Sequence, residues 1–247
     1  MPCVMEADAM ADTRDFAADV ARYDAWYRTP WGAWADEREQ QMLTALARPR
    51  AGERALDVGA GTGRLLNRLL AMGLDAWGVE PAPDMRGAAQ WRVRGAGHDP
   101  ARIIGARGEA LPFADRSFDL VTAVTVLEFV DRPRDVLREM ARTSRGRVFV
   151  GALNGASAYG EQIARGEMGN TLARARLFGV DELLALVREH VRPCSLTWRT
   201  ALLGPRTDDP RELAAQRRLE AEPGADRRPS GAYIAVLAEV SDDRGSA

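Results

Sequence analysis

The chain has 247 residues, of which 46% are hydrophobic and 28% are charged, and its formal net charge is −2. This length and composition predict a globular protein with a full apolar core, while the near-zero charge disfavours the basic excess that nucleic-acid-binding proteins use to displace counterions. No apolar run approaches the roughly 20 residues of a membrane span, and the acidic start MPCVMEADAM is unlike a signal peptide, so we expect a cytoplasmic protein without a membrane partner.

The first predicted element is a helix rich in aromatic residues. The stretch YDAWYRTPWGAW contains Tyr23, Trp26, Tyr27, Trp31 and Trp34. The first three share one helical face, and Pro30 ends that helix before the last two. The rings either clamp the N-terminal helices onto the core or close over a ligand as a lid.

Strand-like and helix-like segments alternate from residue 53 almost to the end. Strands are expected at 53–58, 74–80, 101–107, 117–126, 145–153, 194–203 and 231–240, and helices at 62–72, 82–93, 134–142 and 181–190. This order predicts a parallel sheet flanked by helices with right-handed crossovers. We expect an N-terminal helical lid over 1–50 and a main domain over 51–247. An insertion at 152–178 and a charged segment at 204–230, which carries a short helix, interrupt the pattern.

Three glycines join the first strand to the first helix of the main domain. In LDVGAGTGRLL, Gly59, Gly61 and Gly63 allow unusual backbone angles and close approach of a ligand at the carboxyl edge of the sheet. The GxGxG spacing is one residue shorter than the GxGxxG of dinucleotide sites, which disfavours a nicotinamide oxidoreductase. A tight turn without a ligand remains an alternative.

An acidic residue ends the second strand. Glu80 follows the glycine loop by about 20 residues, where a carboxylate can accept hydrogen bonds from both hydroxyls of a ribose. A solvated strand end is the alternative, but the combination with the glycine loop favours a ribose.

Three motifs together resemble the class I S-adenosylmethionine-dependent methyltransferases. LDVGAGTG, GVEPAPDM and GEALPFADRSFDLVTAVTVLEFVDRP resemble family motifs in the same order and at similar intervals over residues 52–151. The resemblance implies a Rossmann-like three-layer sandwich with a mostly parallel, seven-stranded sheet. The N-terminal YDxWYxTPxG pattern, with GALNGASAYG and ARARLFGVDELLALV, is similar to the small-molecule, type 11-like branch.

The resemblance also implies which residues contact S-adenosylmethionine. The methionine part, the ribose and the adenine would be held by Asp57, Gly59, Gly61, Gly63, Glu80, Pro81, Met85, Glu109 and Ala110. Two positions depart from the usual family pattern. Glu109 stands where many relatives have Asp, and Glu128 stands where many have His, which weakens the expected adenine contact and acid–base role.

A methyl donor gives the aromatic stretch a specific task. A sulfonium is a cation, and aromatic faces attract desolvated cations by roughly 0.5 to 2 kcal/mol. Tyr23 and Trp26 are therefore candidate cofactor contacts in the lid, which would also exclude water.

Few residues are available as a catalytic base. The sulfur leaves as a neutral thioether, so only the acceptor needs one. Glu128, Tyr23 and Tyr159 are the candidate catalytic residues, and Tyr27 could help to orient the acceptor. Asn154, Ser157 and Tyr159 are nominated for the acceptor pocket by the resemblance, with ordinary loop roles as the alternative.

The expected reaction is methyl transfer to a small-molecule acceptor by in-line displacement. With so few bases, we favour proximity catalysis on a thiol, thioether, amine or activated carbon. The alternative is a non-catalytic S-adenosylmethionine-binding sensor or scaffold; a nucleic-acid methyltransferase is disfavoured by charge. Cys3, Cys194, His98 and His190 are isolated, so no metal site is expected, and the assembly is expected to be a monomer or homodimer.

Overall fold

A computed structural model describes residues 20–168, 172 and 174–240 of the chain. The part of the predicted lid from residue 1 to residue 19 therefore lies outside the described residues. The described part begins with two consecutive helices, α2 (Val20–Trp26) and α3 (Pro30–Ala47). Pro30 opens α3, and the Thr29 side chain caps it by accepting a hydrogen bond from the Gly32 N–H.

Seven strands form one sheet in the order β3-β2-β1-β4-β5-β7-β6. Their bounds are β1 Arg54–Val58, β2 Asp75–Val79, β3 Ile103–Ile104, β4 Phe118–Val124, β5 Ser144–Leu153, β6 Ser195–Ala201 and β7 Tyr233–Glu239. β7 lies between β5 and β6 and runs antiparallel to both, while the other neighbours are parallel. The mostly parallel seven-stranded sheet predicted from the sequence is confirmed.

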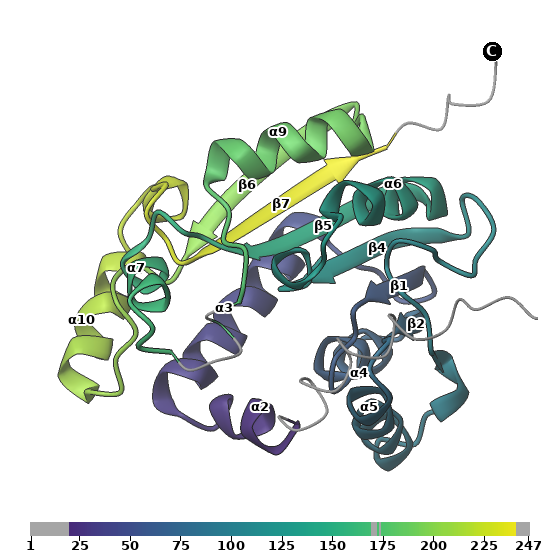
Figure 1. The fold of residues 1–247 in the computed structure, drawn as a ribbon, viewed down its shortest axis with the longest axis horizontal. Helices are drawn as coiled ribbons and strands as arrows, with labels where there is room; N and C mark the ends of the chain where they lie inside the picture. Colours follow the sequence, from purple (N-terminus) through teal and green to yellow (C-terminus); the bar gives the residue numbers. More distant parts are fainter. Residues whose placement is uncertain (1–19, 169–171, 173, 241–247) are drawn as a thin grey trace, which may run out of the picture.

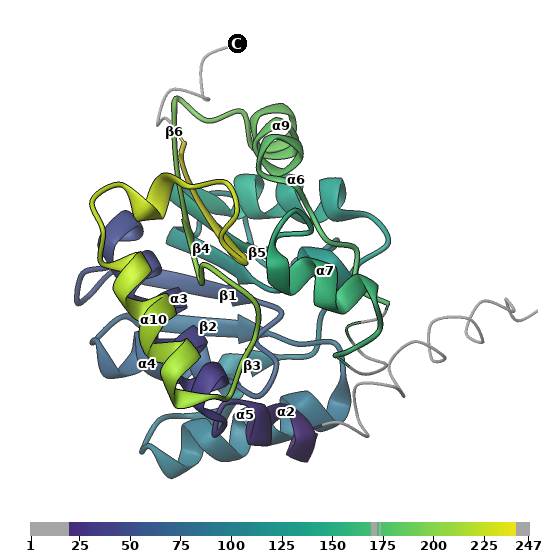
Figure 2. The ribbon, with the colours of Figure 1, turned by 90° about the vertical axis from the view of Figure 1, so that its left-hand side faces the viewer.

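Helices cover both faces of the sheet, as Figures 1 and 2 show. The longer helices after α3 are α4 Arg64–Ala71, α5 Pro83–Gly95, α6 Pro133–Thr143, α7 Ala158–Ala164, α9 Val180–Val191 and α10 Pro210–Glu220. Short 3-10 turns occupy Pro100–Arg102, Leu127–Phe129 and Ala225–Arg227. One apolar cluster packs α3, α4 and α5 under the sheet, and a second packs α6 and α9 on the opposite face.

The buried strands explain why the sheet forms where it does. β4 and β7 are almost entirely buried, as expected for central strands covered on both faces, and they carry near-continuous apolar runs. Because β1, β2, β4 and β5 are parallel, their carboxyl ends meet at one edge, where α2 and the first part of α3 also lie. No helix among the described residues is both long enough and apolar enough to cross a membrane.

Candidate active site

The glycine loop after β1 has a backbone that few other residues could adopt. Gly59, Gly61 and Gly63 have φ values of +71°, +55° and +79°. A Cβ at Gly59 would lie 2.5 Å from a methyl group of Val126, and one at Gly63 would lie 2.9 Å from that of Ala89. At Gly61 the nearest atom is the Tyr23 hydroxyl, 3.9 Å away. Packing therefore requires two of the glycines, while the third faces an open space.

Glu80 is held against this loop by backbone hydrogen bonds. Its Oε2 accepts from the Gly61 N–H and its Oε1 from the Ala82 N–H, both at 2.9 Å. Burial raises the pKa of Glu80, and these two hydrogen bonds oppose the shift. The carboxylate is thus fixed at the end of β2 beside the glycines, with lone pairs left for a ligand.

Asp57 lies on β1, the strand next to β2, and is buried at the same edge of the sheet. It is 3% exposed and accepts a hydrogen bond from Thr122 Oγ1 of the neighbouring β4 at 3.1 Å. Burial raises its pKa to about 7, with the Thr122 hydrogen bond lowering it and the charge of Glu80 adding to the rise. A bound cation would favour the ionised form of this carboxyl group.

The helix α2 is fastened over the loop by polar contacts. Asp24 accepts from Thr62 Oγ1 at 3.0 Å and pairs with Arg92 of α5 at 2.7 Å. The hydroxyl oxygens of Tyr23 and Tyr27 are 2.9 Å apart. These contacts bring the aromatic N-terminal stretch to the glycine loop.

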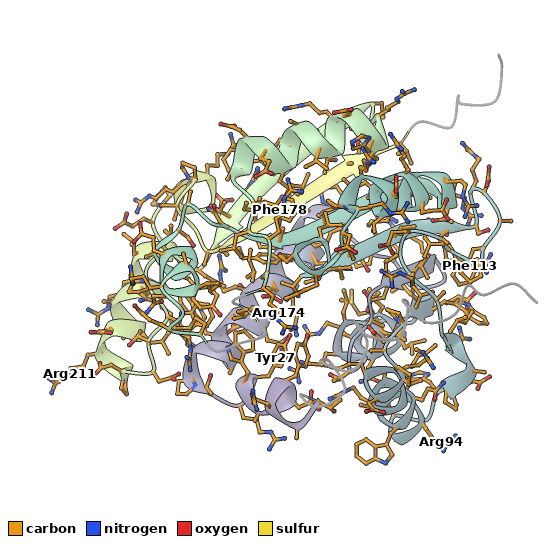
Figure 3. All side chains as sticks on the ribbon, in the orientation of Figure 1. Tyr27, Arg94, Phe113, Arg174, Phe178 and Arg211 are labelled. Atoms are coloured by element: carbon orange, nitrogen blue, oxygen red, sulfur yellow. The ribbon has the colours of Figure 1, made fainter. Side chains whose placement is uncertain are left out.

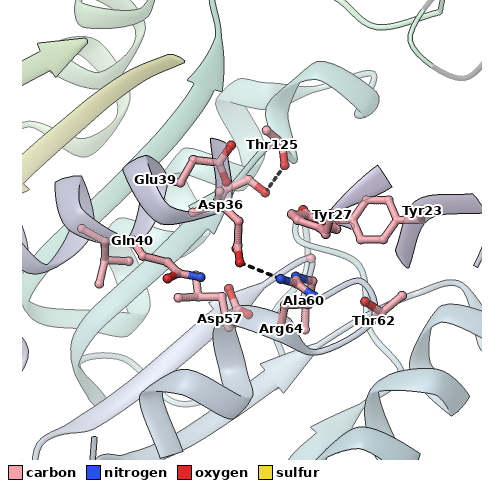
Figure 4. Close-up of a pocket in the computed structure, with 14 residues that line it drawn as sticks. Tyr23, Tyr27, Asp36, Glu39, Gln40, Asp57, Ala60, Thr62, Arg64 and Thr125 are labelled. Carbon is pink, nitrogen blue, oxygen red and sulfur yellow. Dashed lines mark hydrogen bonds and ion pairs between the residues drawn. The ribbon is translucent and has the colours of Figure 1, made fainter. Parts of the chain in front are cut away.

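A cleft lies between α2, α3 and the carboxyl edge of the sheet, with about 570 Å³ of space including that open to solvent. Its lining consists of Tyr23, Tyr27, Asp36, Glu39, Gln40, Leu43, Asp57, Gly59, Ala60, Thr62, Arg64, Leu65, Val124 and Thr125. Figure 4 shows Arg64 reaching Asp36, 2.6 Å away, and its guanidinium lies 3.9 Å from the centre of the Tyr27 ring. Figure 3 shows Arg94 and Arg211 pointing outward.

Comparisons with known proteins indicate the family that this chain resembles. A family model described as a methyltransferase domain matches residues 56–150. An uncharacterized methyltransferase of Mycobacterium tuberculosis is 35% identical over 136 residues, which are 55% of this chain and 51% of that protein. The chain thus spans about half the length of this curated relative. The range 56–150 contains the glycine loop, Asp57 and Glu80.

Residues 56–150 resemble a methyltransferase domain, and the fold of the chain is that of class I methyltransferase structures. A Thermotoga maritima structure described as a methyltransferase, possibly acting on histamine, has the same fold, with a TM-score of 0.65, 23% identity and coverage of 91% and 97% of the two chains. A Haemonchus contortus phosphoethanolamine N-methyltransferase with bound S-adenosylhomocysteine has a TM-score of 0.64 at 14% identity, over 94% of this chain and 61% of that one. S-adenosylmethionine is the cofactor of this family. The open space beside Gly61 and the carboxyl groups of Glu80 and Asp57 fit this cofactor.

The predicted adenine-side residues surround the end of β2 and the loop after β3. Met85 is 5% exposed on α5, and Pro81 follows Glu80 at the surface, where its carbonyl accepts a hydrogen bond from Arg86. Glu109 pairs with Arg107 at 3.5 Å, and Ala110 is exposed beside it. These residues therefore follow β2 and β3 at the carboxyl edge of the sheet. Their contacts with the adenine stay a prediction.

The two aromatic residues assigned to the lid differ in position. Tyr23 lines the cleft, whereas Trp26 packs its ring edge-on against Tyr27 and Trp31, at 4.7 and 5.9 Å between ring centres, and is not among the lining residues. The position of Trp26 fits the interpretation in which the aromatic rings clamp the N-terminal helices onto the core. The position of Tyr23 fits the interpretation in which they close over a ligand as a lid.

The residues nominated after β5 have structural hydrogen bonds. The Asn154 side chain donates to the carbonyls of Pro229 and Gly231 and accepts from the Ala156 N–H. Ser157 caps α7 through the Gly160 N–H. These groups fix loop backbone and do not line the cleft described above. Tyr159, on α7, is also outside this lining; its ring packs against Trp31 with 4.7 Å between ring centres and a tilt of 44°, and burial raises its pKa to about 12.

Glu128 is a buried carboxyl group at the carboxyl end of β4. It is 2% exposed, and its Oε1 accepts from the Leu153 N–H at 2.5 Å. Burial raises the pKa of Glu128 to about 7, and hydrogen bonds with the backbone oppose the shift. A carboxyl group with such a pKa can exchange a proton near neutral pH.

Glu39 is a cleft residue that the sequence reasoning missed. It lies on α3, and burial, followed by the charges of Asp36 and Glu128, raises its pKa to about 8, while Arg64 lowers it. The signal was present in the sequence. Glu39 follows Trp31 and Ala35 at intervals of four residues, so an ionisable side chain interrupts the apolar stripe of this helix.

Proposed function

We propose that the chain is an S-adenosylmethionine-dependent methyltransferase that transfers the methyl group to a small-molecule acceptor by in-line displacement. The observation that carries this proposal is the Glu80 carboxylate, held by the Gly61 N–H beside a glycine loop whose central residue faces open space. The small cleft between α2 and α3 supports an acceptor of low molecular weight.

Each part of the site has a distinct task in this proposal. Glu80 accepts hydrogen bonds from the ribose hydroxyls, and Asp57 holds the ammonium of the methionine part. The glycine loop lets the ligand lie against the main chain, and Tyr23 covers it from α2. When bound, S-adenosylmethionine supplies an electrophilic methyl group and a neutral leaving group.

The protein's contribution to the rate is positioning and exclusion of water. Methyl transfer needs the acceptor atom about 3 to 3.5 Å from the methyl carbon and in line with the bond that breaks. Glu128, Tyr23 and Tyr159 are the proposed catalytic residues that orient the acceptor, with Glu128 able to take its proton. The polar contacts of α2 with the loop keep the cleft covered.

The first test is calorimetric titration of the purified protein with S-adenosylmethionine and S-adenosylhomocysteine. We expect micromolar binding, weakened about 100-fold or more by Glu80→Ala because the ribose loses its carboxylate partner. Glu189→Ala, which removes an exposed carboxylate on α9, is the matched control and leaves binding unchanged. No binding by the wild type would contradict the cofactor assignment.

Turnover then separates the enzyme from the non-catalytic alternative. Release of S-adenosylhomocysteine is measured against a mixed library of thiols, thioethers, amines and carbon acids. Acceptor-dependent release supports the methyltransferase. Tight cofactor binding without release above the background would favour a sensor or scaffold.

A further inference from the structure

Arg64 stands in an electrostatically unfavourable position. It is the first residue of α4, directly after Gly63, and the amino end of a helix carries a partial positive charge that disfavours a cation. Asp36 of α3 compensates this charge, since its Oδ2 lies 2.6 Å from the Arg64 Nη2, as Figure 4 shows. The charge of Arg64 therefore serves contacts outside α4.

The guanidinium of Arg64 also lies on a ring of the aromatic stretch. It is 3.9 Å from the centre of the Tyr27 ring, well within the roughly 6 Å range of a cation–π contact. Tyr23 and Trp26 approach the same ring at steep angles, with 5.2 and 4.7 Å between ring centres. The Tyr27 ring is thus packed between a cation and two other rings.

The hydroxyls of Tyr27 and Tyr23 form the next link. Their oxygens are 2.9 Å apart, so one hydroxyl donates to the other. Burial raises the pKa of Tyr23 to about 12 and that of Tyr27 well above its ordinary value, and the charge of Arg64 partly opposes both rises. Two neutral hydroxyls carry two protons, and only one is used between them. The pair therefore keeps one O–H donor for a ligand.

The last link returns to the glycine loop. The atom nearest to a Cβ at Gly61 would be the Tyr23 hydroxyl, 3.9 Å away. Arg64, Tyr27 and Tyr23 all line the described cleft, as does Asp36. Contacts therefore run from the residue that follows the loop to Tyr27, from Tyr27 to Tyr23, and from Tyr23 back to the loop.

We propose that Arg64 is a positioning residue that sets the Tyr23 hydroxyl over Gly61 through Tyr27, and so fixes an O–H donor for bound S-adenosylmethionine. This inference rests on the proposed methyltransferase function. A planar guanidinium suits the task, because its face stacks on a ring while its edge pairs with a carboxylate. The ammonium group of a lysine keeps the charge but has no flat face to stack.

The first test measures S-adenosylhomocysteine binding to the full chain by calorimetry. Arg64→Met keeps an unbranched side chain without the charge and the planar group, and we expect the dissociation constant to rise about tenfold. Arg64→Lys should lose at least about fivefold, because the stack on Tyr27 is lost while the charge remains. Arg68→Met, one turn further along α4 at an exposed position, is the matched control and leaves binding unchanged. Wild-type affinity in Arg64→Lys would overturn the proposal, since the ion pair with Asp36 would then suffice.

A double-mutant cycle tests whether Arg64 acts through the tyrosines. Tyr23→Phe removes only the hydroxyl and should weaken S-adenosylhomocysteine binding about fivefold in the wild-type background. In the Arg64→Met background the same change should cost less than about twofold, because the hydroxyl is no longer held over Gly61. Independent losses that multiply, or no effect of Tyr23→Phe in the wild type, would overturn the proposal.

The ligand-free protein separates this inference from the proposed function. Residues 20–27 should exchange amide hydrogens faster in Arg64→Met than in the wild type, because Tyr27 loses the contact on its face, and Arg68→Met should show no change. Thermal unfolding checks that all variants fold. Unchanged exchange in Arg64→Met would overturn the positioning role even where S-adenosylhomocysteine binds. Failure of the wild type to bind S-adenosylhomocysteine, beside the expected change in exchange, would instead contradict the proposed function and the cofactor contact that rests on it.

Discussion

Asp24 of α2 accepts a hydrogen bond from the Thr62 hydroxyl of the glycine loop at 3.0 Å. The same carboxylate pairs with Arg92 of α5, and Arg92 in turn donates to the Thr62 carbonyl. A single side chain of the N-terminal helix thus joins the loop and the helix that follow the first two strands. The position of α2 and the shape of the loop are therefore coupled.

Asp24→Ala is expected to loosen α2 without unfolding the domain, because both contacts are partly exposed and the core lies elsewhere. Residues 20–26 should exchange amide hydrogens faster, and S-adenosylhomocysteine should dissociate about three to ten times faster, for a loss of about 1 kcal/mol. Hydrogen exchange by mass spectrometry and stopped-flow binding measure the two effects. Unchanged exchange and dissociation, equal to those of Glu189→Ala, would show that this contact does not hold α2.

The glycines of the loop should separate folding from binding. Gly63→Ala places a methyl group 2.9 Å from Ala89 and at a φ of +79°, so strain and overpacking together should cost about 2 to 4 kcal/mol. Gly61→Ala has the backbone strain alone, since its nearest neighbour is 3.9 Å away. We expect the larger fall in melting temperature for Gly63→Ala, measured by calorimetry. Gly61→Ala should instead lose about tenfold in S-adenosylhomocysteine affinity, because the methyl group enters the open space. The reverse order would contradict both assignments.

Much of this site could be predicted because its signals are local. The apolar run of β1 and the three glycines are continuous in sequence, and Glu80 ends the next strand along the chain; each has a physical reason to stand where it does. Trp26 was harder to place, since a helical face shows which rings lie together but not what they contact.

The surroundings of the buried acidic and phenolic groups depend on contacts between distant segments. Glu39, Glu128 and Tyr233 come from α3, the turn after β4, and the last strand. Only the insertion of β7 between β5 and β6 brings Tyr233 against Gly151. A sequence pattern reports neither strand order nor which loop polar groups, such as those of Asn154, are already hydrogen-bonded.

Cofactor binding should depend on pH through Asp57. The pKa of this carboxyl is raised to about 7, and only its ionised form pairs with the ammonium of S-adenosylhomocysteine. Between about pH 6 and about pH 8 the ionised fraction rises roughly tenfold, so the dissociation constant should fall by about the same factor. Titrations across this range test the change, with Asp57→Asn as the comparison, which should bind weakly and without this slope. A flat wild-type profile would remove Asp57 from the role of ammonium partner.

Glu39 should make the ligand-free protein less stable at alkaline pH. Its folded pKa of about 8 lies above the ordinary value of 4.5, so the folded state binds this proton more tightly than the unfolded state. The stabilising contribution is complete below about pH 4.5 and is lost as the pH rises through about 8. Glu39→Gln cannot ionise, so its melting temperature should match that of the wild type near about pH 5. At about pH 9 its melting temperature should exceed that of the wild type by about 2 to 4 °C for each kcal/mol of stability recovered.

A smaller decline of stability with pH remains in the variant, because burial also raises the pKa values of Asp57 and Glu128. Differential scanning calorimetry over this range measures the effect, and Glu37→Gln, which changes an exposed carboxylate, should follow the wild-type curve. If the Glu39→Gln curve is parallel to that of the wild type at every pH, Glu39 does not hold its proton in the folded protein.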